Sequence, residues 1–187
     1  MLKVRPPTSI ARSSNGRTVA FEAAYPGPNP GLAANKDMED CIFCKIIKGE
    51  IDSAKIWEDK EFAAILDVSP NTKGMILVLT KQHYDSYAFD MPEDIYKRFT
   101  EATRKVAKIL EKGLGVKRVA MVMEGMGINH AHIKLYPLHG ITEKFKEMWG
   151  KEKVFFDKYE GYISTQLGPR VDISTLKKLA EEIKAKI

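Results

Sequence analysis

Three side chains that can carry positive charge, His130, His132 and Lys134, occupy alternate positions of one short segment. Because side chains alternate across a β-strand with a period of two, all three would share one face, while Ala131 and Ile133 would share the other. Neighbouring cations repel one another unless an anion or a metal compensates them. The segment therefore predicts an anion site, with phosphate as the expected ligand. A solvated polar face of an edge strand is the alternative that the segment alone leaves open.

This set of groups suits chemistry at phosphorus. A neutral imidazole is a good nucleophile toward phosphorus, and water can cleave the phosphoramidate that it forms. A neighbouring cation stabilises the negative charge that develops on the phosphoryl oxygens. The pattern therefore favours a group-transfer reaction over a structural role for the segment.

The chain has two cysteines, Cys41 and Cys44, in a C-x-x-C motif, and four histidines. A redox pair, two buried thiols and a metal site are all compatible with this spacing. No βαβ pattern of the thioredoxin kind surrounds the motif, which disfavours redox chemistry. A zinc ion would need two further ligands in addition to the two sulfurs. The motif alone leaves the thiol and metal interpretations open.

Hydrophobic periodicity predicts five strands and three helices. Apolar residues recur every three to four positions after Pro92, which predicts a long helix that Gly113 and Gly115 end. A short helix is expected at residues 41–48 and an amphipathic helix at residues 173–187. Since strands do not alternate regularly with helices, the class is α+β with a mostly antiparallel sheet. The strands are expected at residues 54–59, 61–67, 75–80, 119–123 and 130–138.

Residues 1–37 differ in composition from the rest of the chain. They hold five of the nine prolines and no hydrophobic periodicity, so we expect a disordered extension, or an artefact of translation ahead of a native start at Met38. Much of the net charge of +5 falls on this extension, which disfavours nucleic-acid binding by the body of the protein. No apolar run is long enough to span a membrane, and no signal peptide is visible, so a cytoplasmic location is expected.

Four segments between residues 40 and 140 form a distinctive set in this order. They are CIFCKIIKGEI at 41–51, WEDKEFAAILDVSP at 57–70, GMILVLTKQH at 74–83 and HAHIKLYPLHG at 130–140. Together they resemble the histidine-triad (HIT) superfamily. The resemblance implies a HIT-like fold, which is a five-stranded antiparallel sheet with helices, and a homodimer. It implies a HIT domain at residues 38–140 and a C-terminal extension at residues 141–187 that packs on it.

The resemblance also implies roles for individual residues. His132, in the middle of the triad, would be the nucleophile, with His130 and Lys134 as the other catalytic positions. A structural zinc ion would be held by Cys41, Cys44, His83 and His130. The nucleotide would be bound by Asp67, Gly125, Gly127 and Asn129.

Three departures from the family pattern bear on activity. Lys134 replaces the third histidine, so the motif is HxHxK, and Met75 and Met123 replace a histidine and an asparagine. A lysine is a poorer proton donor near neutral pH than a histidine. We therefore expect slow hydrolysis or nucleotidyl transfer at the α-phosphate of purine nucleoside phosphoramidates or dinucleoside polyphosphates, through a covalent His132-nucleotidyl intermediate. The alternative is a HIT fold that binds a nucleotide or a partner protein without turnover.

Overall fold

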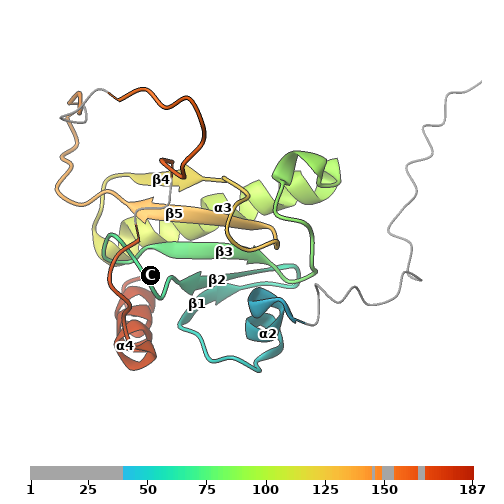
Figure 1. The fold of residues 1–187 in the computed structure, drawn as a ribbon. Coiled ribbons are helices and arrows are strands. Elements are labelled where there is room, and N and C mark those ends of the chain that lie inside the picture. The colour runs from blue at the N-terminus through green and yellow to red at the C-terminus, as the bar shows by residue number, and fades with distance from the viewer. Residues whose placement is uncertain (1–39, 145, 149–153, 164–166) are drawn as a thin grey trace, which may run out of the picture. The chain divides into compact units, whose positions relative to one another are not determined.

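The fold is an antiparallel sheet with helices packed against it (Figure 1). The computed structural model describes residues 40–144, 146–148, 154–163 and 167–187, so the extension expected at residues 1–37 lies outside the described residues. The sheet order is β1-β2-β3-β5-β4, and every neighbouring pair is antiparallel. This arrangement confirms the α+β class and the five strands. The strands are β1 (Lys55–Glu58), β2 (Phe62–Leu66), β3 (Ile76–Thr80), β4 (Val119–Val122) and β5 (His132–Pro137).

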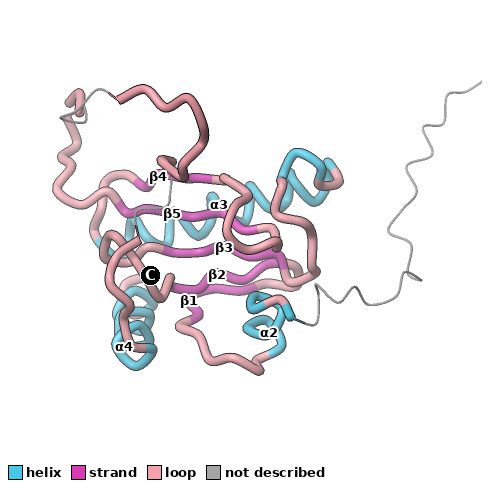
Figure 2. Tube along the Cα trace, viewed as in Figure 1, coloured by secondary structure: helices cyan, strands magenta, loops and turns pink. Residues whose placement is uncertain are grey.

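The helices divide the sheet into a core face and a second face. On the core face, α3 (Glu93–Leu114) and α4 (Ile173–Lys184) bury apolar side chains against β2, β3 and β5. The short helix α2 (Ile42–Lys48) packs on the second face, next to β2 and β3 (Figure 2). A 3₁₀ turn, η1 (Ala88–Asp90), precedes α3. The second face, away from α3 and α4, carries the chemistry described below.

The long helix α3 runs one residue past the first glycine that was predicted to end it. Gly113 lies inside the helix, and Gly115 follows as the cap, with φ of 67°. The reason is the contact with α4, because a Cβ on Gly113 would lie 2.5 Å from Cγ2 of Ile183. Of the two glycines predicted to end the helix, Gly115 is the cap, whereas Gly113 lies in the last turn and allows close helix packing.

The strand that carries the histidines alternates as its sequence predicts. Ile133 and Leu135 are buried in the core shared with α3 and α4, whereas His132 and Lys134 line a cavity on the other face. The strand begins at His132 and not at residue 130. Ahead of it, the N–H of Ala131 donates to the carbonyl of Tyr84 at 2.8 Å, outside the sheet ladder.

Candidate functional site

Four side chains from three separate segments lie close together next to the start of β5. Cys41 caps α2 and Cys44 lies in its first turn, His83 follows β3, and His130 precedes β5. Their ligand atoms all lie within 4.8 Å of one another. Nδ1 of His130 lies 3.4 Å from Sγ of Cys41 and 3.5 Å from Sγ of Cys44, and Nδ1 of His83 lies 3.3 Å from Sγ of Cys44. The predicted metal residues are therefore together in space.

This donor set fits a tetrahedral zinc ion. Zn–S bonds of about 2.3 Å and Zn–N bonds of about 2.0 Å place the ligand atoms of a tetrahedron roughly 3.4–3.8 Å apart, close to the sulfur–nitrogen distances above. Burial lowers the pKa of His130 to about 4, which leaves the imidazole neutral, as a metal ligand must be. Nε2 of His130 donates to the carbonyl of Thr80 at 2.8 Å, so Nδ1 carries the lone pair that faces the sulfurs.

The same environment disfavours the redox interpretation of the C-x-x-C motif. Both cysteines are free and buried, and their sulfurs face imidazole nitrogens. Burial, together with the neighbouring Cys41, raises the pKa of the Cys44 thiol to about 11. A reactive cysteine needs the opposite, a lowered pKa and access to solvent. A bound cation would supply the charge that stabilises the thiolates.

His132 is held in one tautomer by the backbone. Its Nδ1 lies 2.7 Å from the carbonyl oxygen of His130, and because a carbonyl can only accept, Nδ1 carries the proton. Burial lowers the pKa of His132, and the positive charge of Lys134 lowers it further, against the carbonyl contact and the charges of Glu124 and Asp67. The imidazole is therefore neutral near pH 7, with its lone pair on Nε2, which is the state that a nucleophile requires.

The cavity beside His132 has a volume of about 710 Å³. His132 and Lys134 form part of its wall, and the ring of Phe43 meets that of His132 edge-on, with the centroids 5.4 Å apart. A cavity of this size, mostly apolar with a few polar groups, is typical of a small-molecule site. Apolar walls come from α2, β2 and β3, namely Ile42, Ile46, Ile65 and Leu77.

The chain after residue 166 forms another wall of this cavity. Leu167 and Arg170 line it, and the N–H of Val171 donates to the carbonyl of Val68 at 2.8 Å. A Cβ on Gly168 would overlap the carbonyl oxygen of Pro70, so glycine alone permits this close approach. The residues just ahead of α4 therefore shape the mouth of the cavity.

The predicted nucleotide-binding residues fall into two groups. Asp67 and Gly127 line the cavity, and Oδ1 of Asp67 accepts a hydrogen bond from the N–H of Ser69 at 2.8 Å. Gly125 and Asn129 are bonded to the segment before η1 instead. The side-chain Oδ1 of Asn129 accepts from the N–H of Ser86 at 3.0 Å, and the Ser86 hydroxyl donates to the backbone carbonyl of Gly125 at 2.8 Å. These two residues hold the loop that contains Gly127.

Sequence reasoning missed Arg170, which lines the cavity, and Glu124, which lies behind the cavity wall next to Lys134. Oε2 of Glu124 lies 3.7 Å from Nζ of Lys134, and the Glu124 side chain is only 4% exposed. The register pairs Val122 with Lys134, so two further positions along, residue 124 falls opposite His132. Continuing the pairing of the two predicted strands in this way would have placed Glu124 at the site.

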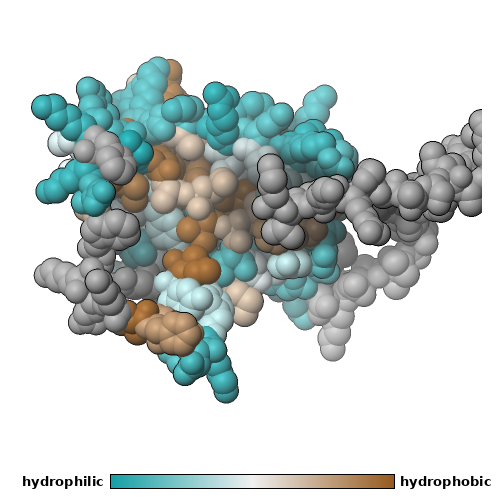
Figure 3. Space-filling view, turned by 90° about the horizontal axis from the view of Figure 1, so that it is seen from above, coloured by the Kyte–Doolittle hydropathy of each residue, from teal (hydrophilic) through white to brown (hydrophobic). Residues whose placement is uncertain are grey.

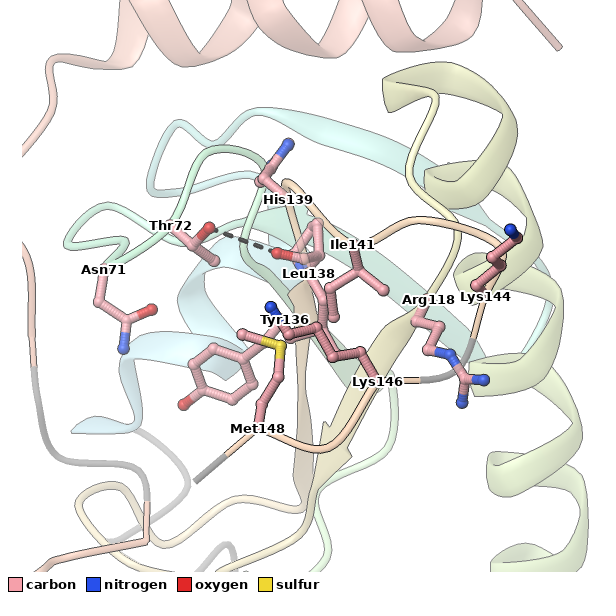
Figure 4. Close-up of a pocket in the computed structure, with 11 residues that line it drawn as sticks. Asn71, Thr72, Arg118, Tyr136, Leu138, His139, Ile141, Lys144, Lys146 and Met148 are labelled. Carbon is pink, nitrogen blue, oxygen red and sulfur yellow. Dashed lines mark hydrogen bonds between the residues drawn. The ribbon is translucent and has the colours of Figure 1, made fainter. Parts of the chain in front are cut away.

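A second cavity of about 570 Å³ lies further along β5 and contains none of the predicted catalytic, nucleotide or metal residues (Figure 4). Tyr136, Arg118 and Lys146 are among its lining residues. His139, to which the sequence assigned no role, lies at its edge with Nε2 donating to the carbonyl of Lys73 at 2.8 Å. The chemistry expected of the histidine segment therefore belongs to the cavity beside His132.

No helix in the described part of the chain combines the length and the hydropathy needed to cross a membrane.

Comparison with known families settles the relationship. Residues 48–142, just over half of the chain, match the family described as HIT domain. The chain belongs to the HIT family. Among solved structures, this HIT protein resembles a zinc-bound histidine triad family protein from Mycobacterium smegmatis, with a TM-score of 0.56 and 21% identity over 80% of this chain and 94% of the other. At that identity the likeness bears on the fold alone.

Relatives by sequence include proteins with named activities. The HIT protein is 33% identical to Protein hit of Bacillus subtilis over 65% of this chain and 85% of the relative. It is 28% identical to an adenosine 5′-monophosphoramidase of Candida albicans over 63% of this chain and 83% of the relative. It is 27% identical to an adenylylsulfatase of Arabidopsis thaliana over 60% and 68%. These relatives support a nucleotide hydrolase or transferase class in general.

Proposed function

We propose that this HIT protein is a nucleotide hydrolase or nucleotidyltransferase that acts at the α-phosphate through a covalent His132-nucleotidyl intermediate. The observation that carries the proposal is the 2.7 Å contact between Nδ1 of His132 and the carbonyl of His130. That contact keeps the lone pair on Nε2, on a side chain that lines the cavity. Nucleoside phosphoramidates, dinucleoside polyphosphates and phosphosulfates all present a phosphorus to such a nucleophile.

The other cavity residues divide the remaining tasks. Lys134 provides a positive charge for the phosphoryl oxygens. Asp67 accepts hydrogen bonds from the ribose hydroxyls, and Gly127 lets the backbone approach the phosphate. The apolar wall that includes Phe43 and Leu77 suits a purine ring, which buries more apolar area than a pyrimidine.

Zinc has a structural part in this proposal. Cys41, Cys44, His83 and His130 would hold it, and these side chains occupy all four tetrahedral positions. The ion would supply cross-linking of α2 to the ends of two strands. Since the carbonyl of His130 orients His132, an ordered His130 also positions the nucleophile.

A binding module without turnover is the second candidate, and two observations favour it. Lys134 is paired with Glu124, which offsets part of the positive charge available to a phosphate. In addition, Met75 is buried and lies outside the cavity, so no imidazole takes the place of the missing family histidine. A module of this kind would bind a nucleotide with the same affinity before and after loss of the His132 imidazole.

One experiment separates the two functions. The zinc-loaded protein and His132→Ala are incubated with adenosine 5′-phosphoramidate or adenosine 5′-phosphosulfate, and release of AMP is measured. We expect release by the original protein and a loss of at least about 100-fold in the variant, because the nucleophile is gone. His139→Ala, which removes an exposed histidine outside the cavity, serves as the matched control. Folded, zinc-containing protein that releases no AMP from either substrate would favour the binding module.

We also propose a cytoplasmic homodimer. Strand β4 ends the sheet, and its Met121 is exposed. The view from above shows hydrophobic surface that is bordered by hydrophilic residues (Figure 3). An exposed strand edge with apolar side chains is suited to contact with a second copy. Sedimentation of the purified protein at a single mass equal to one chain would contradict the dimer.

A further inference from the structure

Lys134 and Glu124 form a charged pair beside His132, and Lys134 lies where the triad pattern has its third histidine. The side chain of Lys134 is 14% exposed and that of Glu124 is 4% exposed, and the two charged groups are 3.7 Å apart. A buried ammonium group without an anion is costly, and a carboxylate at this distance compensates it. An ammonium–carboxylate pair therefore takes the place of the triad histidine that would transfer a proton.

A lysine and a histidine at this position serve different leaving groups. The pKa of a free histidine is about 6.5 and that of a free lysine about 10.4, so only the histidine exchanges a proton readily near pH 7. A leaving group that departs as an amine must gain a proton as its bond to phosphorus breaks. A leaving group that departs as a stable oxyanion needs only charge stabilisation, which an ammonium group provides without proton transfer.

We propose that the Lys134–Glu124 pair selects mixed anhydrides of nucleoside 5′-monophosphates, such as phosphosulfates, over phosphoramidates. This inference rests on the proposed function, because it names the substrate class of the same site. Lys134 acts on the leaving oxyanion and the phosphoryl oxygens. Glu124 is a positioning residue, since it fixes the ammonium group and does not itself touch the substrate.

The bonds and protons balance without an added oxidant or reductant. Nε2 of His132 forms a bond to phosphorus, the bond from phosphorus to the sulfate oxygen breaks, and sulfate leaves with the electron pair. Water then attacks phosphorus, the nitrogen–phosphorus bond breaks with its pair returning to Nε2, and one water proton passes to solvent. The products are AMP, sulfate and a proton. With a phosphoramidate, the leaving nitrogen needs an additional proton to depart as ammonia, and the ammonium group of a lysine is a weak donor for it.

The test compares the ratio of kcat/KM for adenosine 5′-phosphosulfate to that for adenosine 5′-phosphoramidate. We expect the original protein to prefer the phosphosulfate. We expect Lys134→His to lower the ratio by roughly 100-fold, since positioned proton transfer contributes on that order. Because a loss of folding lowers both rates alike, the ratio reports the leaving group specifically. If Lys134→His does not fold, Lys134→Gln should still lower the ratio. The phosphosulfate then loses charge stabilisation of both the phosphoryl oxygens and the leaving oxyanion, whereas the phosphoramidate loses only the first.

The variant Glu124→Gln tests whether Glu124 positions the ammonium group of Lys134. We expect it to lower kcat for the phosphosulfate in the original background and to have a smaller effect on a Lys134→His background, because its partner is then absent. Glu93→Gln breaks an exposed Glu–Lys pair at the start of α3 and is the matched control. Equal effects of Glu124→Gln in both backgrounds would overturn its positioning role.

These measurements distinguish a failure of this inference from a failure of the proposed function. An original protein that is active, yet keeps its ratio in Lys134→His, overturns the inference and leaves the function standing. An original protein that is folded, zinc-loaded and inactive on both substrates contradicts the proposed function and the inference together.

Discussion

His132 owes its chemistry to the peptide carbonyl two residues before it. The carbonyl of His130 fixes the proton on Nδ1, and burial favours the neutral ring, so the lone pair lies on Nε2, the proposed nucleophile. Strand position separates the proposed metal ligand from the proposed nucleophile. His130 precedes β5 and turns toward the cysteines, whereas His132 is the first residue of the strand and lines the cavity.

The candidate site could be predicted only in part. The residues with distinctive chemistry, such as His132 and Cys41, stand out by type and spacing. Glu124 does not, because its place depends on the register of β4 with β5 and on the turn between them. Asn129 was predicted to bind the nucleotide, and in the structure its side chain is hydrogen-bonded to Ser86 and Asp85. Hydrophobic periodicity gives no information on such local hydrogen bonds.

Removal of the charge on Asp67 should weaken substrate binding more than turnover. The expected result for Asp67→Asn is a KM raised roughly tenfold with kcat little changed, because a hydrogen bond to a charged group contributes about 1.5 kcal/mol or more. Steady-state rates of AMP release measure both quantities. Asp90→Asn, an exposed aspartate outside the cavity, is the control. A fall in kcat with KM unchanged would place Asp67 in the chemical step instead.

The contact between α3 and α4 determines how the C-terminal part of the chain joins the sheet. Ile183 of α4 is fully buried against Gly113 of α3. The residues just before α4 form a wall of the cavity, so the docking of this helix also shapes the site. Sequence periodicity predicted both helices and their approximate ends, but not the packing role of Gly113, because a pattern within one helix does not reveal its neighbour.

A methyl group added at the helix contact should be destabilising. We expect Gly113→Ala to lower the free energy of unfolding by roughly 1–3 kcal/mol, since the new Cβ would overlap Ile183 and overpacking of a tight contact costs about that much. Urea denaturation measures the change. Glu101→Ala, on the exposed face of the same helix, is the control. Stability equal to that of the original protein would show that α4 does not pack as described.

The start of α4 should respond to pH through its capping residue. Hydrogen bonds from Ser174 and Thr175 hold the pKa of Asp172 well below its usual range. Because the pKa is lower in the folded state, the stabilisation is fully present above the unfolded value of about 3.9 and is lost as the pH falls through the folded value. The melting temperatures of the original protein and Asp172→Ala should therefore differ at pH 7 and converge toward pH 2. A difference that does not change with pH would contradict the charged cap.

In the whole molecule, the metal cluster joins parts of the chain that lie far apart in sequence. It links the helix α2 to the end of β3 and to the approach to β5, through residues 41, 83 and 130. The succession of strands and helices along the chain and the α+β class could be predicted from the sequence, because hydrophobic periodicity distinguishes the two kinds of element. The spatial grouping of the four ligands came from family resemblance, since no local pattern relates positions this distant.

Removal of zinc should loosen the nucleophile as well as lower stability. We expect protein treated with a chelator to melt at a lower temperature and to lose most AMP release, with both recovered on adding zinc, because metal binding is coupled to folding of the site. Cys44→Ser should reproduce the loss without recovery. Calorimetry and metal analysis provide the measurement. A metal-free protein with the original melting temperature and activity would contradict a structural role for zinc.

Trapping the proposed covalent intermediate on His132 tests the mechanism. The zinc-loaded protein is mixed with adenosine 5′-phosphosulfate, denatured within the first turnover under conditions that preserve nitrogen–phosphorus bonds, and digested for mass spectrometry. We predict an adenylyl group on the peptide that contains His132, and none in His132→Ala. AMP release by the original protein with the His132→Ala variant equally active, or an adenylyl group on another residue, would contradict the mechanism.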